Sequence, residues 1–189
     1  MGPSGCGKTT LLNMIGGLDA SSKGSVEVGK ISIHDMSESE LTAFRLKHIG
    51  FVFQAYNLIP VLTAKENIEF IMVLQNIDAK TIHERSNDLL DRMGIKDQRD
   101  RRPSEISGGQ QQRVAVARAL ASRPKFVLAD EPTANLDSGS TEALLDIMAK
   151  LNEEENITFI FSTHDQRVID RANRVITLED GVIVSDEHR

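Results

Sequence analysis

The sequence predicts an α/β fold in which a largely parallel sheet is covered by helices and interrupted by an inserted helical block. The first residues, MGPSGCGKTT, fill the pattern G-x-x-x-x-G-K-[ST] of a phosphate-binding loop that opens into a helix. Apolar strand-like runs alternate with amphipathic helical patterns on either side of the block. Between about residue 55 and residue 120 the strand signals stop, and only helical patterns remain.

Composition bounds the class of protein. The chain has 189 residues, 40% of them hydrophobic, which suits one globular domain. Its formal net charge of −6 argues against a direct nucleic-acid partner, because nucleic acid usually selects a basic face. The one cysteine, Cys6, allows no intrachain disulfide and favours a reducing compartment. The apolar run 70–74 is too short to span a bilayer, so we expect a cytoplasmic protein that reaches the membrane through a partner.

The glycine-rich loop is expected to bind nucleotide phosphates through its backbone N–H groups. Lys8 would reach the terminal phosphates, and the Thr9 hydroxyl would ligate Mg²⁺. The following helix, with Leu11, Ile15 and Leu18 on one face, would add its positive end to the field. The residues expected to contact the nucleotide are Gly2, Pro3, Ser4, Gly5, Cys6, Gly7, Lys8, Thr9 and Thr10. We interpret Cys6 as a small loop residue, with a redox-sensitive thiol as the alternative.

The next segment predicts short strands and one helix. The strands are expected at 24–28, 30–33 and 49–53. The first two alternate in polarity, as an antiparallel pair does, whereas the third is apolar throughout and ends at Gln54. Between them, Ser37 and Glu40 form a capping box for a helix that runs toward His48.

The middle of the chain predicts a helical lobe. Thr63 and Glu66 form a second capping box, Gly94 stops a further helix, and a third helix starts at Ser107. The charged segment 97–102 is expected to be a solvated loop, because its mixed charge does not favour the alternative of a basic binding patch.

Strands and helices then alternate again. The expected strands are 126–129, 157–161, 175–178 and 182–184, and the expected helices are 138–151 and a short one around Val168. Asp180-Gly181 predicts a tight turn between the last two strands, and the acidic run 153–155 is interpreted as a solvated helix end. We therefore divide the chain into a core of residues 1–54 and 121–189 and a helical subdomain of residues 55–120.

Two carboxylates follow the apolar strand at 126–129. Asp130 and Glu131 stand at its carboxyl end, the edge of a parallel sheet where ligands bind. Asp130 can hold the Mg²⁺ coordination shell, usually through water, and Glu131 can orient or deprotonate the water that attacks a γ-phosphate. A solvated exit from the strand would explain an isolated Asp-Glu pair, but the phosphate loop in the same chain favours catalysis.

The segment 106–120, ISGGQQQRVAVARAL, resembles the signature segment of the ATP-binding cassette (ABC) ATPases, with isoleucine in place of the usual leucine. Its Ser107, Gly108, Gly109 and Gln110 place a hydroxyl and bare backbone N–H groups at a helix start, where anions bind. In that family the segment closes over the nucleotide held by the opposite subunit. The resemblance therefore implies a P-loop NTPase with a RecA-like core that sandwiches two ATP molecules in a head-to-tail dimer.

Three further positions match the family. Gln54 resembles the glutamine that senses Mg²⁺ and the γ-phosphate, Asp137 resembles the aspartate that communicates across the dimer, and His164 resembles the switch histidine. Taken alone, they would be a strand end, a helix N-cap and a structural histidine. The resemblance thus implies catalytic roles for Glu131, His164 and Gln54, and Mg²⁺ ligation by Thr9, Gln54 and Asp130.

The resemblance covers essentially the whole chain, with its motifs in the family's order. The segments 49–60, 62–67 and 131–137 are most similar to the branch that includes lipoprotein-releasing and macrolide-exporter ATPases. This implies an ATP-hydrolysing subunit that drives export through a separate permease, on the inner face of the cell membrane. One alternative is an ATP-dependent regulator of a membrane protein in envelope remodelling, without cargo. The other is a soluble ATPase acting on nucleic acid or ribosomes, for which coiled-coil arms, tandem cassettes or basic inserts would be expected.

The start of the sequence departs from the family pattern. Family members carry, ahead of the phosphate loop, an antiparallel region with an aromatic residue that stacks on adenine, and then a core strand. This sequence begins one residue before its first glycine, so we expect both features to be missing and sheet edges to be left unpaired. Either Met1 is a misassigned start within a longer reading frame, or the short chain is real and defective. Tyr56, the only tyrosine, is not assigned to adenine.

Overall fold

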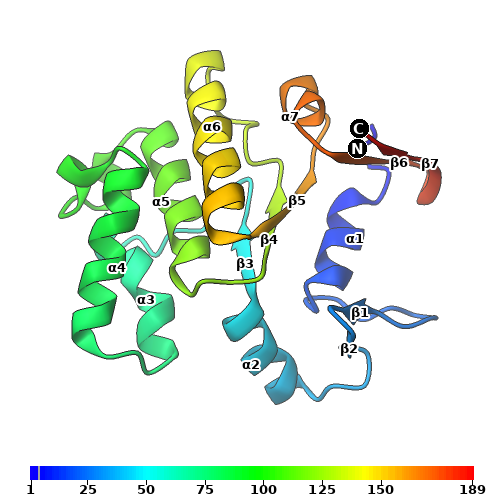
Figure 1. Ribbon diagram of the computed structural model, residues 1–189, viewed down its shortest axis with the longest axis horizontal. Coiled ribbons are helices and arrows are strands. Elements are labelled where there is room, and N and C mark those ends of the chain that lie inside the picture. Colours follow the sequence, from blue (N-terminus) through cyan, green and yellow to red (C-terminus); the bar gives the residue numbers. More distant parts are fainter. Residues whose placement is uncertain (4) are drawn as a thin grey trace.

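A parallel sheet of three strands lies at the centre of the molecule (Figure 1). The strands are β3 (Ile49–Val52), β4 (Phe126–Asp130) and β5 (Thr158–Ser162), in the order β3-β4-β5. The structure is a computed structural model that describes residues 1–3 and 5–189, and Ser4, one of the expected phosphate contacts, lies outside the described residues. All three strands fall where the sequence predicts them, and their parallel pairing is confirmed.

Alternate residues of β4 build two separate cores, because successive side chains of a strand point to opposite faces of the sheet. Val127 and Ala129 belong to the larger core, together with Leu144. Leu128 belongs to the smaller core, with Leu12 and Phe44. The helices on these two faces are α5 (Gly108–Ala121) and α6 (Ser138–Glu155), opposite α1 (Lys8–Ile15) and α2 (Glu38–His48). The sheet is therefore the middle of three layers, as expected of an α/β fold.

A helical block packs beside the sheet, on the left in Figure 1. It contains α3 (Ala64–Leu74), α4 (Ala79–Arg92) and α5, with two short 3₁₀ turns, η1 (Lys96–Gln98) and η2 (Pro103–Glu105), ahead of α5. Ile68, Leu89 and Leu120 of this block share the larger core with Val52 of β3. The block and the sheet thus bury one continuous apolar surface.

Glycine permits close contact between β3 and α5. A Cβ atom on Gly50 would lie 2.3 Å from the backbone oxygen of Ala119, which no side chain can tolerate. The absence of a side chain at this position therefore sets how closely the helix approaches the strand.

Two small antiparallel sheets flank the parallel one. β1 (Glu27–Val28) pairs with β2 (Ile31–Ser32), and β6 (Arg174–Glu179) pairs with β7 (Val182–His188), as the sequence predicts. The pair β6-β7 stands apart from the parallel sheet, because β6 forms no ladder with β5. Instead, the Leu178 N–H donates to the Met1 carbonyl at 2.9 Å, so the start of the chain lies along β6. Within the described residues, the outer edge of β5 has no strand partner.

Local helix signals are mostly confirmed. Both predicted capping boxes form, Ser37 with Glu40 ahead of α2 and Thr63 with Glu66 ahead of α3. One expectation is wrong: α1 ends at Ile15, so Leu18 lies beyond the helix and is 43% exposed. The helix is too short to carry the third residue of the predicted apolar face.

Two surface segments are more structured than the sequence indicates. Part of the expected loop at 97–102 forms η1, and its backbone carbonyls at Arg99 and Arg101 accept hydrogen bonds from the first residues of α3. The acidic helix end at 153–155 is not wholly solvated, because the Glu155 carboxylate bonds to Arg85 at 2.8 Å. In both cases the partner comes from a distant part of the sequence. In the described part of the chain, no helix is both long and apolar enough to cross a bilayer.

Candidate active site

The phosphate loop leads directly into α1. Gly5 and Gly7 adopt left-handed backbone angles, with φ of 81° and 94°, which glycine accepts without strain. Gly7 is the N-cap of α1, and no described side chain caps this helix. Because the first N–H groups of a helix have no intrahelical acceptor, they are positioned to bind an anion. Thr10, the last of the expected phosphate contacts, lies in this first turn.

Lys8 folds back onto the loop that precedes it. Its ammonium group donates to the carbonyls of Gly2 at 2.8 Å and Pro3 at 2.7 Å. The cation therefore already sits over the loop, and it can exchange these neutral acceptors for phosphate oxygens.

Packing against β6 explains the glycine at the start of the loop. A Cβ atom on Gly2 would lie 2.2 Å from the Leu178 carbonyl oxygen and 2.7 Å from the Cys6 Sγ atom. Cys6 itself is buried, with only 4% of its surface exposed. This burial agrees with its interpretation as a small residue that fills the inside of the loop.

Thr9 and Asp130 meet where α1 begins and β4 ends. The Thr9 hydroxyl donates to the Asp130 carboxylate at 2.9 and 3.1 Å. The structure thus brings together two of the three predicted Mg²⁺ ligands, which come from elements 121 residues apart in the sequence. Hydroxyl and carboxylate oxygens are the ligands that Mg²⁺ prefers, so the pair fits the ion.

Glu131 and His164 form a second pair at the same edge of the sheet. The Glu131 carboxylate lies 2.7 Å from His164 Nδ1 and accepts a hydrogen bond from the Thr163 hydroxyl at 3.2 Å. With Glu131 ionised, Nδ1 carries the proton of this hydrogen bond. The Glu131 side chain is 15% exposed and that of His164 is 70% exposed, so a largely covered carboxylate is paired with a solvent-exposed imidazole ring.

The backbone of Glu131 holds its side chain at this edge. Its φ of 45° is unusual for a residue with a Cβ atom, and its N–H donates to the Ser162 carbonyl at 2.8 Å. Such angles persist where surrounding bonds fix them, and they gather at functional sites.

Gln54 lies two residues beyond the end of β3, and its exposed side chain has no described hydrogen bond. Its carbonyl accepts a hydrogen bond from the Asn135 amide at 3.1 Å. Just beyond it, the Arg118 guanidinium bonds to the carbonyls of Tyr56 and Asn57. Sequence reasoning missed Arg118; the only available signal was a cation within the apolar run VAVARALA of α5.

The signature residues cluster at the start of α5. Ser107 is the N-cap, and it forms a capping box with Gln110 through bonds of 2.9 and 3.3 Å. A Cβ atom on Gly108 would lie 3.1 Å from the Tyr56 hydroxyl, and one on Gly109 would lie 3.6 Å from the Ser140 hydroxyl. These glycines therefore lie between the segment after Gln54 and the start of α6.

Asp137 caps α6. Its carboxylate accepts hydrogen bonds from the backbone N–H and the hydroxyl of Ser140, at 2.9 and 2.6 Å, and these bonds lower its pKa. Within residues 1–3 and 5–189, no hydrogen bond joins Asp137 or the signature residues to the phosphate loop. One copy of the chain thus carries two separate groups of predicted site residues.

Sequence reasoning also missed Asp165, next to His164. It accepts a hydrogen bond from the Thr133 hydroxyl at 2.9 Å and binds the Arg167 guanidinium through bonds of 2.9 and 2.7 Å. The hydrogen bonds from Arg167, foremost among the causes, lower the pKa of Asp165 to about 2. The segment after Glu131 is thereby tied to the segment that carries His164.

Comparisons with known proteins agree with this geometry. A family model described as "ABC transporter" matches residues 1–134. An uncharacterized ABC transporter ATP-binding protein of Methanocaldococcus jannaschii is 48% identical over 184 residues, which cover 97% of this chain and 82% of the relative. The lipoprotein-releasing system ATP-binding protein LolD of Legionella pneumophila is 39% identical over 187 residues, or 99% of this chain and 82% of that protein.

The fold also matches solved structures. One is the dimeric ATP-binding cassette MJ0796 of M. jannaschii in a post-hydrolysis state, bound to ADP and Pi. The two chains are 42% identical and superpose with a TM-score of 0.93 over 100% of this chain and 83% of the other. These findings confirm the α/β cassette fold and ATP binding. The chain belongs to the ABC transporter family and is the ATP-hydrolysing subunit of a transporter.

Proposed function

We propose that this chain hydrolyses ATP at Glu131, between two head-to-tail copies, and that the resulting motion drives export through a separate permease. The observation that carries the catalytic assignment is the Glu131–His164 pair beside the Thr9–Asp130 pair. Together they place a carboxylate, an imidazole and two oxygen ligands at one sheet edge, next to the anion-binding start of α1.

The residues of this edge divide the chemistry between them. Lys8 and the first N–H groups of α1 bind the phosphates of ATP, which requires Lys8 to leave the carbonyls of Gly2 and Pro3. Glu131 orients the attacking water and accepts its proton on a carboxylate oxygen. His164, which holds that carboxylate through Nδ1, keeps its other ring nitrogen free to face the γ-phosphate.

Thr9, Asp130 and Gln54 would hold Mg²⁺, which when bound neutralises phosphate charge. The described residues contain no group of three or more His, Cys, Asp or Glu side chains suited to a metal. The ion would therefore share its coordination with ATP phosphates and water, as Mg²⁺ commonly does.

The second copy would supply the signature residues. Ser107 and Gly108 stand apart from the phosphate loop of their own copy, and the start of α5 offers N–H groups to an anion. The related cassette MJ0796 is dimeric in its solved structure, which supports this arrangement. Asp137, at the start of α6, would lie near the same interface.

Replacing Glu131 tests the catalytic assignment. Glu131→Gln keeps the side-chain shape but removes the proton acceptor, so we expect ATP turnover to fall by roughly 10²–10⁴-fold while ATP binding persists. Phosphate release and the binding of a fluorescent ATP analogue measure the two effects separately.

Glu153→Gln is the matched control, because Glu153 is exposed on α6 and carries no described salt bridge. It should turn over ATP like the unaltered chain. Unchanged turnover in Glu131→Gln would remove Glu131 from the mechanism.

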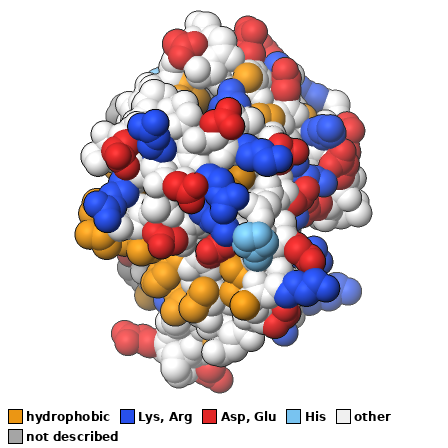
Figure 2. Space-filling view, turned by 90° about the vertical axis from the view of Figure 1, so that its left-hand side faces the viewer, with side chains coloured by type: hydrophobic (Ala, Val, Ile, Leu, Met, Phe, Trp, Pro, Cys, Tyr) orange, Lys and Arg blue, Asp and Glu red, His pale blue; other side chains and the backbone are white. Residues whose placement is uncertain are grey.

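An apolar groove supports the permease part of the proposal. A cavity of about 440 Å³ opens between α2, β3, α3 and α5, and it is lined by aromatic and aliphatic side chains that include Phe51, Phe53 and Phe70. Near it, Val73 and Leu74 are 56% and 50% exposed. Figure 2 shows hydrophobic side chains gathered on the lower part of this side of the molecule. The lining includes two arginines and no carboxylate, which suits an apolar permease segment that carries an acidic residue.

A charge placed on this surface should disrupt docking to the permease and leave ATP hydrolysis by the isolated chain intact. Val73→Asp is expected to prevent co-purification with the permease, while ATP turnover of the isolated chain is retained. Val182→Asp, at an equally exposed valine of β7, is the control and should retain the complex. A complex of normal stability with Val73→Asp would place the permease elsewhere. If the complex hydrolyses ATP but moves no cargo in vesicles, the regulatory function replaces export.

A further inference from the structure

We propose that Arg118 is the positioning residue for Gln54, which it holds in place through two backbone carbonyls of the segment that follows. This inference rests on the proposed role of Gln54 at the Mg²⁺-ATP site. It assigns to a residue of α5, the helix that begins with the signature, the positioning of a residue just beyond β3.

Arg118 makes a bidentate contact with the two carbonyls. Nη1 of Arg118 donates to the Asn57 carbonyl at 2.5 Å, and Nη2 donates to the Tyr56 carbonyl at 2.9 Å. The planar guanidinium presents both N–H groups in a fixed geometry, so it fixes the spacing of the two acceptors. A lysine ammonium is a single point charge and cannot reproduce this arrangement.

The segment held by Arg118 has an unfavourable backbone. Tyr56 and Asn57 are consecutive residues with left-handed angles, φ of 60° and 49°. Side chains with a Cβ atom rarely adopt this conformation, and it persists only where neighbouring groups enforce it. The Asn57 N–H bonds to the Ala55 carbonyl at 2.6 Å, so Arg118 closes a turn that is already tight.

The surroundings of Arg118 leave the carbonyls as its main partners. No carboxylate forms a salt bridge with it within residues 1–3 and 5–189. Its side chain is half-buried and lines the apolar cavity beside Phe51 and Phe53. Burial lowers the pKa of the guanidinium, although it remains charged at neutral pH. Loss of the side chain would remove the donor to both carbonyls, of which that of Tyr56 is partly buried.

The same contact links α5 to the position of Gln54. Ser107 stands at one end of α5 and Arg118 lies near the other, while the Gln54 carbonyl is tied to Asn135 on its far side. A movement of α5 is therefore transmitted through the two carbonyls to the segment that begins with Gln54. Engagement of the signature by a second copy and the placement of Gln54 become coupled through one side chain.

Hydrogen–deuterium exchange of the purified chain tests the contact directly. In Arg118→Ala, amides in residues 54–59 should exchange at least tenfold faster, and in Arg118→Lys they should show an intermediate increase. Arg113→Ala is the matched control, because Arg113 on the same helix donates to the Met93 carbonyl at 2.7 Å. Its effect should appear near residue 93 and leave 54–59 unchanged. Unchanged exchange at 54–59 in Arg118→Ala would overturn the proposal.

A double-mutant cycle tests whether Arg118 acts through Gln54. We expect Arg118→Ala and Gln54→Ala each to lower Mg²⁺-dependent ATP turnover about tenfold, and the double variant to be no worse than Gln54→Ala alone. Arg113→Ala combined with Gln54→Ala should give the product of the two single effects. If the effects of Arg118→Ala and Gln54→Ala also multiply, Arg118 does not act through Gln54. If Gln54→Ala alone leaves turnover unchanged, the proposed role of Gln54 fails, while the exchange experiment still decides what Arg118 holds.

Discussion

At the scale of single residues, the site depends on hydrogen bonds between side chains that are far apart in the sequence. Glu131 bonds to His164, and Thr133 bonds to Asp165, so two parallel contacts join the segments that follow β4 and β5. The second contact involves Asp165, the residue next to His164. Asp165 is thus placed to orient the segment on which His164 is carried.

The pH dependence of stability should reveal Asp165. Its folded pKa of about 2 lies below the ordinary value of 3.8, so its stabilisation is complete above about pH 4 and is lost as the pH falls toward 2. Asp165→Asn should lower the free energy of unfolding by about 1–2 kcal/mol between pH 5 and 7, and by less as the pH falls below 4. Urea unfolding across this pH range measures the difference.

Asp100→Asn serves as the control, because this carboxylate is 83% exposed and, among the described residues, forms a salt bridge with Arg99 alone. Its effect on stability should be small at every pH. An Asp165→Asn deficit that stayed constant down to pH 2 would show that the side chain stabilises the fold for a reason other than its charge.

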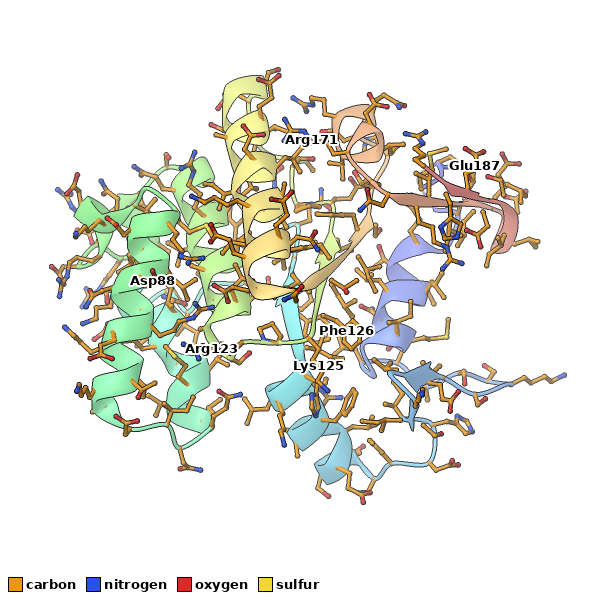
Figure 3. All side chains as sticks on the ribbon, viewed as in Figure 1. Asp88, Arg123, Lys125, Phe126, Arg171 and Glu187 are labelled. Carbon is orange, nitrogen blue, oxygen red and sulfur yellow. The ribbon has the colours of Figure 1, made fainter. Side chains whose placement is uncertain are left out.

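At the scale of elements, an ion pair joins the helical block to α6. Arg85 of α4 is 7% exposed and donates to both oxygens of Glu155 at 3.0 and 2.8 Å, and also to the Leu120 carbonyl at 3.0 Å. Asp88 of α4 and Arg123, just beyond α5, line the same polar cavity (Figure 3). Three helices are therefore held together by one buried cation.

Removing one partner of this ion pair should lower the free energy of unfolding far more than replacing both partners with apolar residues. Arg85→Ala leaves Glu155 without its buried partner, so we expect a loss of about 3–5 kcal/mol in the free energy of unfolding. Arg85→Met combined with Glu155→Leu should recover most of that loss, because it removes both charges and keeps the volume. Urea unfolding followed by circular dichroism measures each variant.

Arg171 (Figure 3), the residue that follows α7, provides the comparison, since it forms an exposed ion pair with Asp146 of α6. Arg171→Ala should cost less than about 1 kcal/mol. An equally small loss of unfolding free energy in Arg85→Ala would mean that the Arg85–Glu155 pair is exposed to water in solution.

The elements that the sequence predicts well are those with local signals. The capping boxes at Ser37 and Thr63, the Asp180-Gly181 turn and the apolar run of β4 each depend on residues within a few positions. The expectation for Leu18 failed because α1 ends at Ile15, where Gly16 is the C-cap and Gly17 has a left-handed φ of 64°.

Partners from distant segments could not be predicted in the same way. In the sequence, Glu155 belongs to an apparently solvated acidic run, and only the fold places Arg85 beside it. Arg118 is likewise a cation in an apolar helix, and only the fold places the Tyr56 carbonyl beside it. The motifs named most of the candidate site, whereas the residues that position it depend on tertiary contacts. For the same reason, the pattern of 175–178 did not distinguish a strand of the parallel sheet from the separate pair formed by β6 and β7.

At the scale of the whole molecule, one copy carries two separate groups of predicted site residues. The phosphate loop, Asp130 and Glu131 lie at the end of the sheet, while Ser107 lies at the start of α5. We propose that residues 1–54 and 121–189 form the core and that 55–120 form the helical subdomain. Because Val52 and Val127 share one apolar core with this block, we expect the two parts to unfold together.

ATP-dependent dimerisation tests the central claim most directly. In Glu131→Gln, slow hydrolysis should preserve bound Mg-ATP, so sedimentation velocity should show a monomer without nucleotide and a dimer with it. Adding Ser107→Arg places a bulky cation at the start of α5, where the partner's ATP would bind, and should restore the monomer. A Glu131→Gln chain that binds ATP yet stays monomeric, or one that dimerises equally well with Ser107→Arg, would contradict the shared site.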